Sequence, residues 1–383
     1  MTDQLYFSRD TKVFIERNGF FYEIPVLDGF SFSQAHNSSE VTLSEAADTS
    51  GGSRRAKQMF NDSFAPTEWS FSTYVRPFVA STGGTKGTLG RTNSEATLDF
   101  HHAVEETLWD AFVYNGDVTG TGVTSNVAQL AVEFDQSNTT TVGTFNLYFM
   151  LNWNTAGTSM KIYKVADAVV NEASLDFDIE GISTISWSGF GGQLTDEGTT
   201  IPFDDEYNNA TDLIYEGVGS TNNYIRNKLT TLSLVGLNSA PSTDTYSVVL
   251  TGGNVTFSNN ITYLTPETIG QVNQPLGHVT GTRSVNGNFT AYLDSDTVSK
   301  STASLFEDIA EGTSVVTTDF RAVFTIGGST KPKVEIVLEH AHLEIPTFEL
   351  GDVVSIECNF TGLPSTIEGT DEATVRYLGI GLA

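Results

Sequence analysis

Apolar and polar residues alternate with a period of two along much of this chain. The alternation is clearest over residues 69–77 (WSFSTYVRP), where apolar side chains take every second position. It predicts a half-buried strand, which Pro77 limits because proline has no amide hydrogen for the sheet ladder. Residues 288–294 (NFTAYLD) repeat the pattern, and Phe71 and Phe289 are 218 residues apart. The polar faces of the two predicted strands carry Ser70, Ser72, Tyr74, Arg76, Asn288, Thr290, Tyr292 and Asp294.

The rest of the chain predicts further strands and two helices. Residues 11–22 read as a hairpin turning at Asn18-Gly19. A 3.6-residue period over 101–114 (HHAVEETLWDAFVY) predicts a helix, and 301–311 predicts a second one. Further strands are expected at 25–32, 40–44, 127–134, 144–153, 159–164 and 173–187.

The predicted elements occur twice in the same order. Residues 254–258 match 29–33 at a spacing of 225, and the closing strands at 173–177 and 185–189 match 346–350 and 358–362 at 173. One strand match arises easily by chance, but an ordered set of hairpin, strands, helix and closing strands does not. We therefore expect a mainly β protein with two tandem β-sandwich or barrel domains, each with one flanking α-helix. Their boundaries are expected at 1–190 and 228–383, with a linker at 191–227.

Charge narrows the possible functions. The 383 residues include 47 acidic and 19 basic side chains, a net charge of −28, and both halves are acidic. Binding nucleic acid through its phosphates requires Lys and Arg, so this composition argues against it. One cysteine excludes an internal disulfide framework. The sequence shows neither a signal peptide nor an apolar run long enough to predict a membrane segment.

One stretch departs from the strand pattern and gathers positive charge. Residues 46–60 (AADTSGGSRRAKQMF) place Arg54, Arg55 and Lys57 among small residues. This segment is either a solvated loop or a projecting arm whose basic tip meets an acidic neighbour, since opposite potentials orient docking.

No group of residues predicts an active site, and we expect no catalytic, cofactor or metal site. His340 and His342 alternate on a predicted strand, but a metal site usually needs a third ligand. Asp196 with residues 204–206 (DDE) lacks EF-hand spacing. Cys358 has apolar residues two positions away on either side, which favours an inert buried thiol. Nucleophile-elbow and phosphate-loop motifs are missing from the sequence.

The ordered set of motifs resembles the tail tube (major tail) protein family of long-tailed bacteriophages. The resemblance depends on FSFS at 30–33, EVTL at 40–43, the Arg54-Arg55 arm, the 69–77 strand, the following helix and ISWSG at 185–189. The second half repeats this order with weaker matches, and it lacks a basic arm; residues 262–282 are its nearest equivalent. The resemblance implies β-sandwich domains whose sheets join in a ring around an inner barrel, with rings stacked into a tube.

Several expectations follow from this resemblance. A chain with two tube domains implies a pseudo-hexameric ring of three subunits, part of the virion tail and made in the host cytoplasm. The polar-face residues named above become candidates for the lumen, and Arg54, Arg55 and Lys57 candidates for the contact between rings. Expected partners are further copies, the tail terminator, the tape measure and the baseplate or tip, while genomic DNA passes through without specific binding. The alternatives are a carbohydrate- or receptor-binding β-sandwich of the virion and, with no support from any motif, a β-rich glycosidase.

Overall fold

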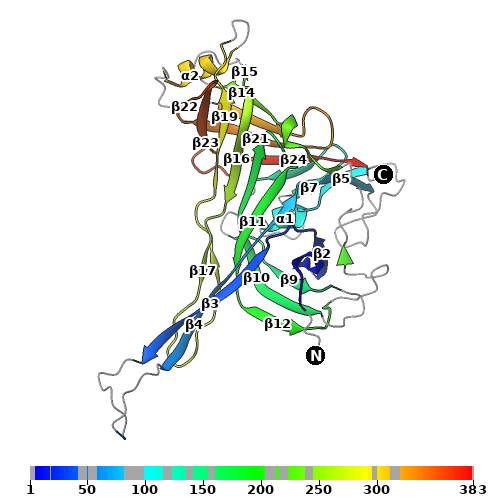
Figure 1. Ribbon diagram of the computed structural model, residues 1–383, viewed down its shortest axis with the longest axis vertical. Coiled ribbons are helices and arrows are strands. Elements are labelled where there is room, and N and C mark those ends of the chain that lie inside the picture. The colour runs from blue at the N-terminus through cyan, green and yellow to red at the C-terminus, as the bar shows by residue number, and fades with distance from the viewer. Residues whose placement is uncertain are drawn as a thin grey trace.

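A computed structural model gives the fold. It describes residues 5–17, 19–41, 50, 58–81, 99–114, 123–134, 141–153, 160–202, 213–214, 223–237, 245–295, 300–310 and 320–381. The predicted arm tip with Arg54, Arg55 and Lys57 lies outside this set. The fold is mainly β with the helices α1 and α2, as the sequence predicts (Figure 1).

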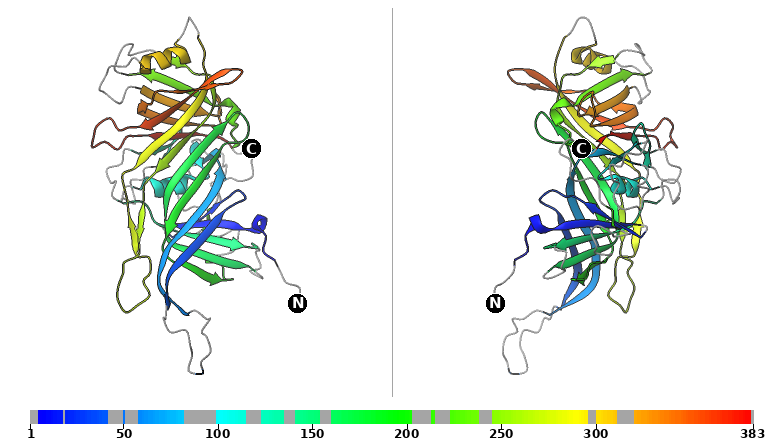
Figure 2. Two further views of the ribbon diagram at one scale, coloured as in Figure 1. Left: turned by 60° about the vertical axis from the view of Figure 1, so that its left-hand side comes forward. Right: turned by 90° about the vertical axis from the view of Figure 1, so that its right-hand side faces the viewer.

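Eight antiparallel strands form one continuous array that crosses both halves of the chain. Figure 2 shows its blue, green and yellow strands side by side as a curved sheet. In spatial order the strands are β3 (Ser31–Val41), β4 (Gln58–Tyr74), β11 (Thr184–Gly191), β10 (Lys161–Asp178), β16 (Leu250–Ser258), β19 (Ser284–Tyr292), β23 (Val354–Gly362) and β22 (Thr347–Leu350).

The array consists of two sets of four strands, which we call quartets. The first is β3–β4–β11–β10 and the second is β16–β19–β23–β22. The strands that the sequence matches between its halves occupy the same places in the two quartets. Strands β10 and β16 pair from Glu172↔Ser258 to Asp178↔Gly252, and this seam joins the quartets within one chain.

The amino-terminal half of β10 belongs to a second sheet. The sequence predicts separate strands at 159–164 and from 173, whereas β10 is one strand of 18 residues that passes from one sheet into the other. Two elements of the predicted linker, β12 and β13, pair with strands of this sheet. Its strands are, in order, β12 (Leu194–Gly198), β10, β9 (Phe145–Leu151), β1 (Lys12–Arg17), β2 (Phe20–Ile24) and β13 (Leu213–Ile214).

The last strands of the chain pack into its first half. β24 (Thr374–Leu378) pairs with β8 (Leu130–Glu133), and β25 (Ile380–Gly381) pairs with β5 (Pro77–Ser81). The two halves are therefore interlocked. The remaining strands around β24 are β21 (Lys333–Leu343), β20 (Phe320–Ile326), β14 (Thr231–Gly236), β15 (Thr245–Ser247), β7 (Val123–Ser125) and β6 (Asp99–Ala103).

Helix α1 is shorter than its periodicity suggests. It spans Glu106–Phe112, because residues 101–103 of the predicted helix belong to β6 and pair with β5. Trp109 of α1 lies over the seam, with its ring centroid 5.0 Å from that of Trp187 and 5.4 Å from that of Phe257. Helix α2 (Thr302–Ala310) agrees with the prediction. The short 3-10 turns are η1 (Ser8–Asp10) and η3 (Asn227–Leu229).

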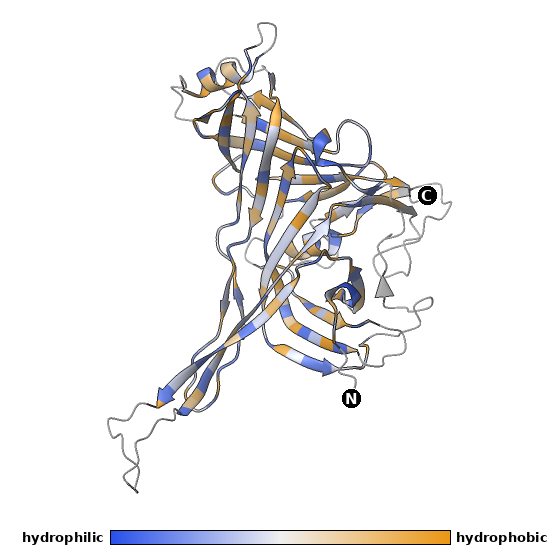
Figure 3. Ribbon diagram, in the orientation of Figure 1, coloured by the Kyte–Doolittle hydropathy of each residue, from blue (hydrophilic) through white to orange (hydrophobic). Residues whose placement is uncertain are grey.

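The apolar face of the array forms the main core. Trp69, Phe71 and Phe289 are at most 2% exposed, which confirms the predicted inward faces of β4 and β19. The alternation of buried and polar positions is visible along these strands in Figure 3.

Two strand glycines accommodate aromatic rings at the corresponding place in each quartet. In the first, Trp69 on β4 packs over Gly189 on β11; in the second, Phe360 on β23 packs over Gly287 on β19. A Cβ atom at either glycine would lie 2.5 Å from the ring, so neither position tolerates a side chain without movement.

Candidate functional site: the polar face of the array

The outer face of the array is covered by short polar side chains in cross-strand rows. One row runs Ser72, Ser186, Ser174, Thr256, Asn286 and Thr361. Hydroxyl oxygens of Ser72 and Ser186 lie 3.1 Å apart, those of Ser174 and Thr256 lie 2.9 Å apart, and Thr361 donates to Asn286 at 3.1 Å. The seam thus carries the same polar surface as the quartets.

The strands of this face carry negative charge. The strands β3, β4, β11, β16, β19, β22 and β23, with the segment of β10 that pairs with β16, contain neither lysine nor arginine. Exposed carboxylates on them include Glu68, Asp176, Asp178 and Glu357. A phosphate close to these strands would meet carboxylates and neutral hydroxyl groups, and no lysine or arginine of the strands themselves. Lys228 lies beside Asp178 and Tyr292 at the end of this face.

The polar-face residues predicted from sequence lie in two places. Six of them, Ser70, Ser72, Tyr74, Asn288, Thr290 and Tyr292, lie on the outer face of β4 and β19. Asp294 is exposed but follows the end of β19. Arg76 needs correction: β4 ends at Tyr74, and beyond it Arg76 is only 3% exposed, with its guanidinium 4.6 Å from the ring centroid of Tyr224.

The residues predicted from sequence make up only part of this surface. Its acidic members Asp176 and Glu357 lie on β10 and β23, outside the two strands that the alternation singled out. The same alternation of polar and apolar residues that marked β4 and β19 is also present at 172–178 and 354–362. What the sequence could not show is that these strands continue one face.

The arm of the first quartet does not project alone. β3 and β4 extend beyond the array, and the excursion with β17 (Thr262–Leu264) and β18 (Gly277–Val279) runs beside them (Figure 1). Asn273 joins the two: its carbonyl accepts from the Phe64 amide at 2.9 Å, and its amide donates to the Asp62 carbonyl at 3.1 Å. The expected counterpart at 262–282 is thus bound to the first arm within the same chain.

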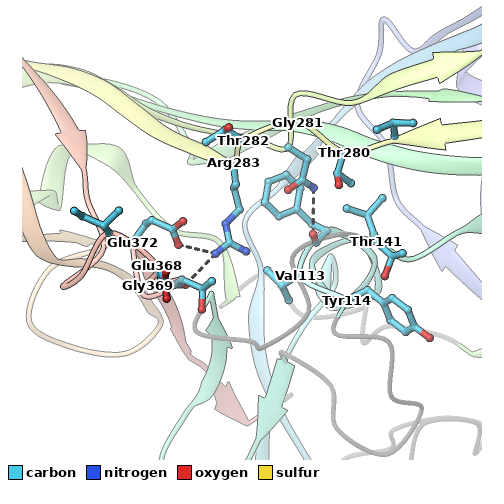
Figure 4. A pocket seen from close by; sticks show the side chains of 16 residues that line it. Val113, Tyr114, Thr141, Thr280, Gly281, Thr282, Arg283, Glu368, Gly369 and Glu372 are labelled. Carbon is cyan, nitrogen blue, oxygen red and sulfur yellow. Dashed lines mark hydrogen bonds and ion pairs between the residues drawn. The ribbon is translucent and has the colours of Figure 1, made fainter.

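A cavity of about 690 Å³ lies between the end of α1, the start of β19 and residues 367–372 (Figure 4). Arg283 crosses it, with its guanidinium 2.6 Å from the Glu372 carboxylate and 2.7 Å and 2.9 Å from the carbonyl oxygens of Phe134 and Thr370. The side chain also stacks on the Phe134 ring. These bonds tie the two halves of the chain together, and they give Arg283 a structural role.

Buried ionisable groups gather where β24 meets α1. Trp109 Nε1 donates to the Tyr377 hydroxyl at 2.6 Å, and burial raises the pKa of the neighbouring Glu105 to about 7. Arg17 and Asp110 form a buried ion pair nearby. These groups lie in the core junction of the two halves, well away from the polar face of the array.

Among the described residues, the other candidates from the sequence form no recognisable reaction centre. Within the described residues, no group of His, Cys, Asp and Glu side chains could hold a metal ion. His340 is partly buried and His342 exposed. Cys358 is buried as expected, and burial raises the pKa of its thiol to about 12. Asp196 pairs with Lys161, while residues 204–206 lie outside the described part of the chain.

Comparison with known proteins gives a concordant result. The family model for phage tail tube protein matches residues 43–362. The chain is 31% identical over 368 residues to the tail tube protein pb6 of Escherichia phage T5, covering 93% of this chain and 70% of that protein. In the part of the chain that is described, no helix is long and apolar enough to span a membrane. This chain belongs to the phage tail tube protein family.

Proposed function

We propose that the protein is the structural subunit of a tail tube in which three chains form each ring and rings stack into a conduit for DNA. The observation that carries this proposal is the repeated quartet. Each chain supplies two quartets joined edge to edge, so three chains supply six. Three arrays of eight strands give a ring of 24, and barrels of 16–18 strands already enclose an aqueous channel.

The polar face is the natural lining of that channel. Its hydroxyl and amide groups are neutral and its charged groups are acidic, so DNA phosphates would find no fixed partner on it. The opposite face is covered by α1, by the second sheet and by β20, whose Phe324 ring packs on Phe177 and Phe360, and this cover argues against its lining a channel. Ser70, Ser72, Tyr74, Asn288, Thr290 and Tyr292 are accordingly proposed to line the channel together with Asp176 and Glu357.

Assembly supplies the test. Concentrated purified protein should form rings or tubes with a hollow centre in negative-stain electron microscopy. A preparation that stays monomeric at every concentration, and that binds sugars on a glycan array, would support the receptor-binding alternative instead. In an infected lysate, an antibody against the chain should label the tail shaft along its length.

A further inference from the structure

The polar face differs chemically between the two quartets. In the first quartet the directly opposed outer residues of β4 and β11 are serines, in the pairs Ser70↔Ser188 and Ser72↔Ser186. In the second quartet three directly opposed residues of β16, β19 and β23 are asparagines, in the order Asn254, Asn288 and Asn359. We call these three side chains the asparagine row.

The asparagine row lies in a hollow of the polar face. The hollow has a volume of about 390 Å³, and Glu344, which follows β21, also lines it. The next row along the strands, Thr256, Asn286 and Thr361, lines it as well. Amide and hydroxyl groups therefore surround a space in the size range of small-ligand sites.

Carboxylates fix the orientation of two amides in this row. Nδ2 of Asn288 donates to the Glu357 carboxylate at 2.8 Å, and Nδ2 of Asn359 donates to the Glu344 carboxylate at 2.9 Å. An ionised carboxylate only accepts hydrogen bonds, so each amide must turn its NH₂ group toward it. This leaves the amide oxygens of Asn288 and Asn359 without a donor among the described residues, and a ligand in the hollow can supply one.

The groups around the hollow suit a ligand that is positively charged. Glu344 contributes a carboxylate, and the strands β16, β19 and β23 contain neither lysine nor arginine. Asp176 on β10 is directly opposite Asn254, so a carboxylate stands at each end of the asparagine row. We propose that this row binds a linear polyamine, whose ammonium groups donate to its amide and carboxylate oxygens.

The spacing of the acceptors favours a chain of ammonium groups over a metal ion. Ca²⁺ takes about six to eight oxygen ligands that converge on one point, whereas Glu344 is the carboxylate among the described residues that line this hollow. Neighbouring strands are about 4.8 Å apart, so the row from Asp176 to Asn359 spans about 14 Å. Short methylene chains separate the ammonium groups of a linear polyamine, which can therefore meet successive acceptors along the row.

The proposed site belongs to one chain and does not depend on a ring. In the proposed tube the asparagine row lines the channel and occurs once per chain, hence three times in a ring of three chains. Bound polyamine then places positive charge at fixed positions of the second quartet and not of the first.

Calorimetric titration with spermidine at low salt tests the site. Because His342 is exposed on the adjoining strand β21, the titration is best made at pH 8, above the ordinary range of histidine titration. The Asn288→Ser/Asn359→Ser variant keeps the net charge and should bind spermidine at least about fivefold more weakly, since it loses two amide acceptors. The control Asn37→Ser/Asn61→Ser makes the same substitutions on β3 and β4, outside the hollow, and should bind as the wild type does.

A matched pair of charge variants separates this site from a general counterion effect. Glu344→Gln removes the carboxylate of the hollow and should weaken binding about threefold. Glu267→Gln removes an exposed carboxylate elsewhere, and its effect should be below about 1.5-fold. Equal effects of these two variants, or wild-type affinity in Asn288→Ser/Asn359→Ser, would mean that spermidine is only a diffuse counterion and would overturn the inference.

Nuclear magnetic resonance of the wild type needs no substitution. The side-chain amide signals of Asn288 and Asn359 should shift as spermidine is added, and unshifted signals at saturation would also overturn the inference. A trilysine peptide that bound the row more tightly than spermidine would assign the site to a polypeptide and overturn the polyamine.

The outcomes separate this site from the proposed tube. If the protein forms rings but does not bind spermidine at the asparagine row, the site is overturned and the tube function stands. If the protein binds spermidine there but never forms rings, the proposed function fails and the site stands.

Discussion

Ser174 on β10 and Thr256 on β16 lie directly opposite each other, with their hydroxyl oxygens 2.9 Å apart. This pair marks the seam where a strand from the first half of the chain meets one from the second. Because the polar surface crosses it without interruption, one chain already contains the type of junction that the proposed ring needs between subunits.

The inward aromatic residues of the array should dominate its stability. Replacing Phe71 or Phe289 with Ala should lower the free energy of unfolding by about 3–5 kcal/mol, because each side chain is at most 2% exposed. Denaturant unfolding followed by tryptophan fluorescence measures this loss. Ser72→Ala, on the other face of β4, is the matched control and should cost at most about 1 kcal/mol. If both phenylalanine variants lose less than about 1 kcal/mol, the assignment of the buried and polar faces is wrong.

Glu105 should make stability depend on pH. Its pKa is about 7 in the folded chain against an ordinary value of 4.5, so the folded state binds the proton more tightly than the unfolded state. The stabilising effect of that proton is complete below about pH 4.5 and is lost as the pH rises through 7, by roughly 3 kcal/mol.

The neutral Glu105→Gln variant removes this loss. Its stability relative to the wild type should rise between pH 5 and pH 8, as melting temperatures in matched buffers would show. Glu267→Gln, at an exposed position, is the control and should show no such change. If Glu105→Gln follows the wild type at both pH values, Glu105 is already charged in the fold.

The polar face should repel DNA only while it lacks cations. Tubes built from Glu68→Lys/Asp176→Lys protein should retain a short fluorescent DNA duplex that wild-type tubes release. Retention should weaken with salt, since each phosphate contact adds about 0.9 to the slope of log affinity against log salt. Asp10→Lys/Glu267→Lys makes the same change of charge on exposed residues outside the strands of the array. Equal retention by both variants would rule out a specific role for the face.

The basic segment should act in stacking rather than in folding. Replacing Arg54 and Arg55 with Glu reverses two charges in the stretch that the sequence predicts to be either a solvated loop or a projecting arm. The variant should keep the wild-type melting temperature and form rings, but tubes should be shorter in electron micrographs. Arg226→Glu, outside that stretch, serves as a comparison. Tubes of unchanged length would count against the arm.

Local sequence patterns predicted several strands and one hairpin of this fold. The alternation around Phe71 and Phe289 identified two buried strand faces, and Asn18-Gly19 identified the hairpin of β1 and β2. These features depend on neighbours within a few residues, so a single sequence contains them.

Pairing between distant strands was not accessible in this way. The seam of β10 and β16 joins residues about 80 positions apart. The alternation of polar and apolar residues in either strand would be the same if that strand lay at the edge of a sheet, so it does not reveal the partner strand. The predicted start of the first helix was wrong for a related reason. His101 and His102 fit a helical period, but they pair with β5 and belong to β6.

The mass of an isolated ring tests the central claim most directly. One chain has a mass of 41.4 kDa, so native mass spectrometry of rings released from tubes should give about 124 kDa, the mass of three subunits. A ring of six chains, near 248 kDa, or a protein that remains at 41.4 kDa under conditions of assembly, would contradict a tube ring built from three double quartets.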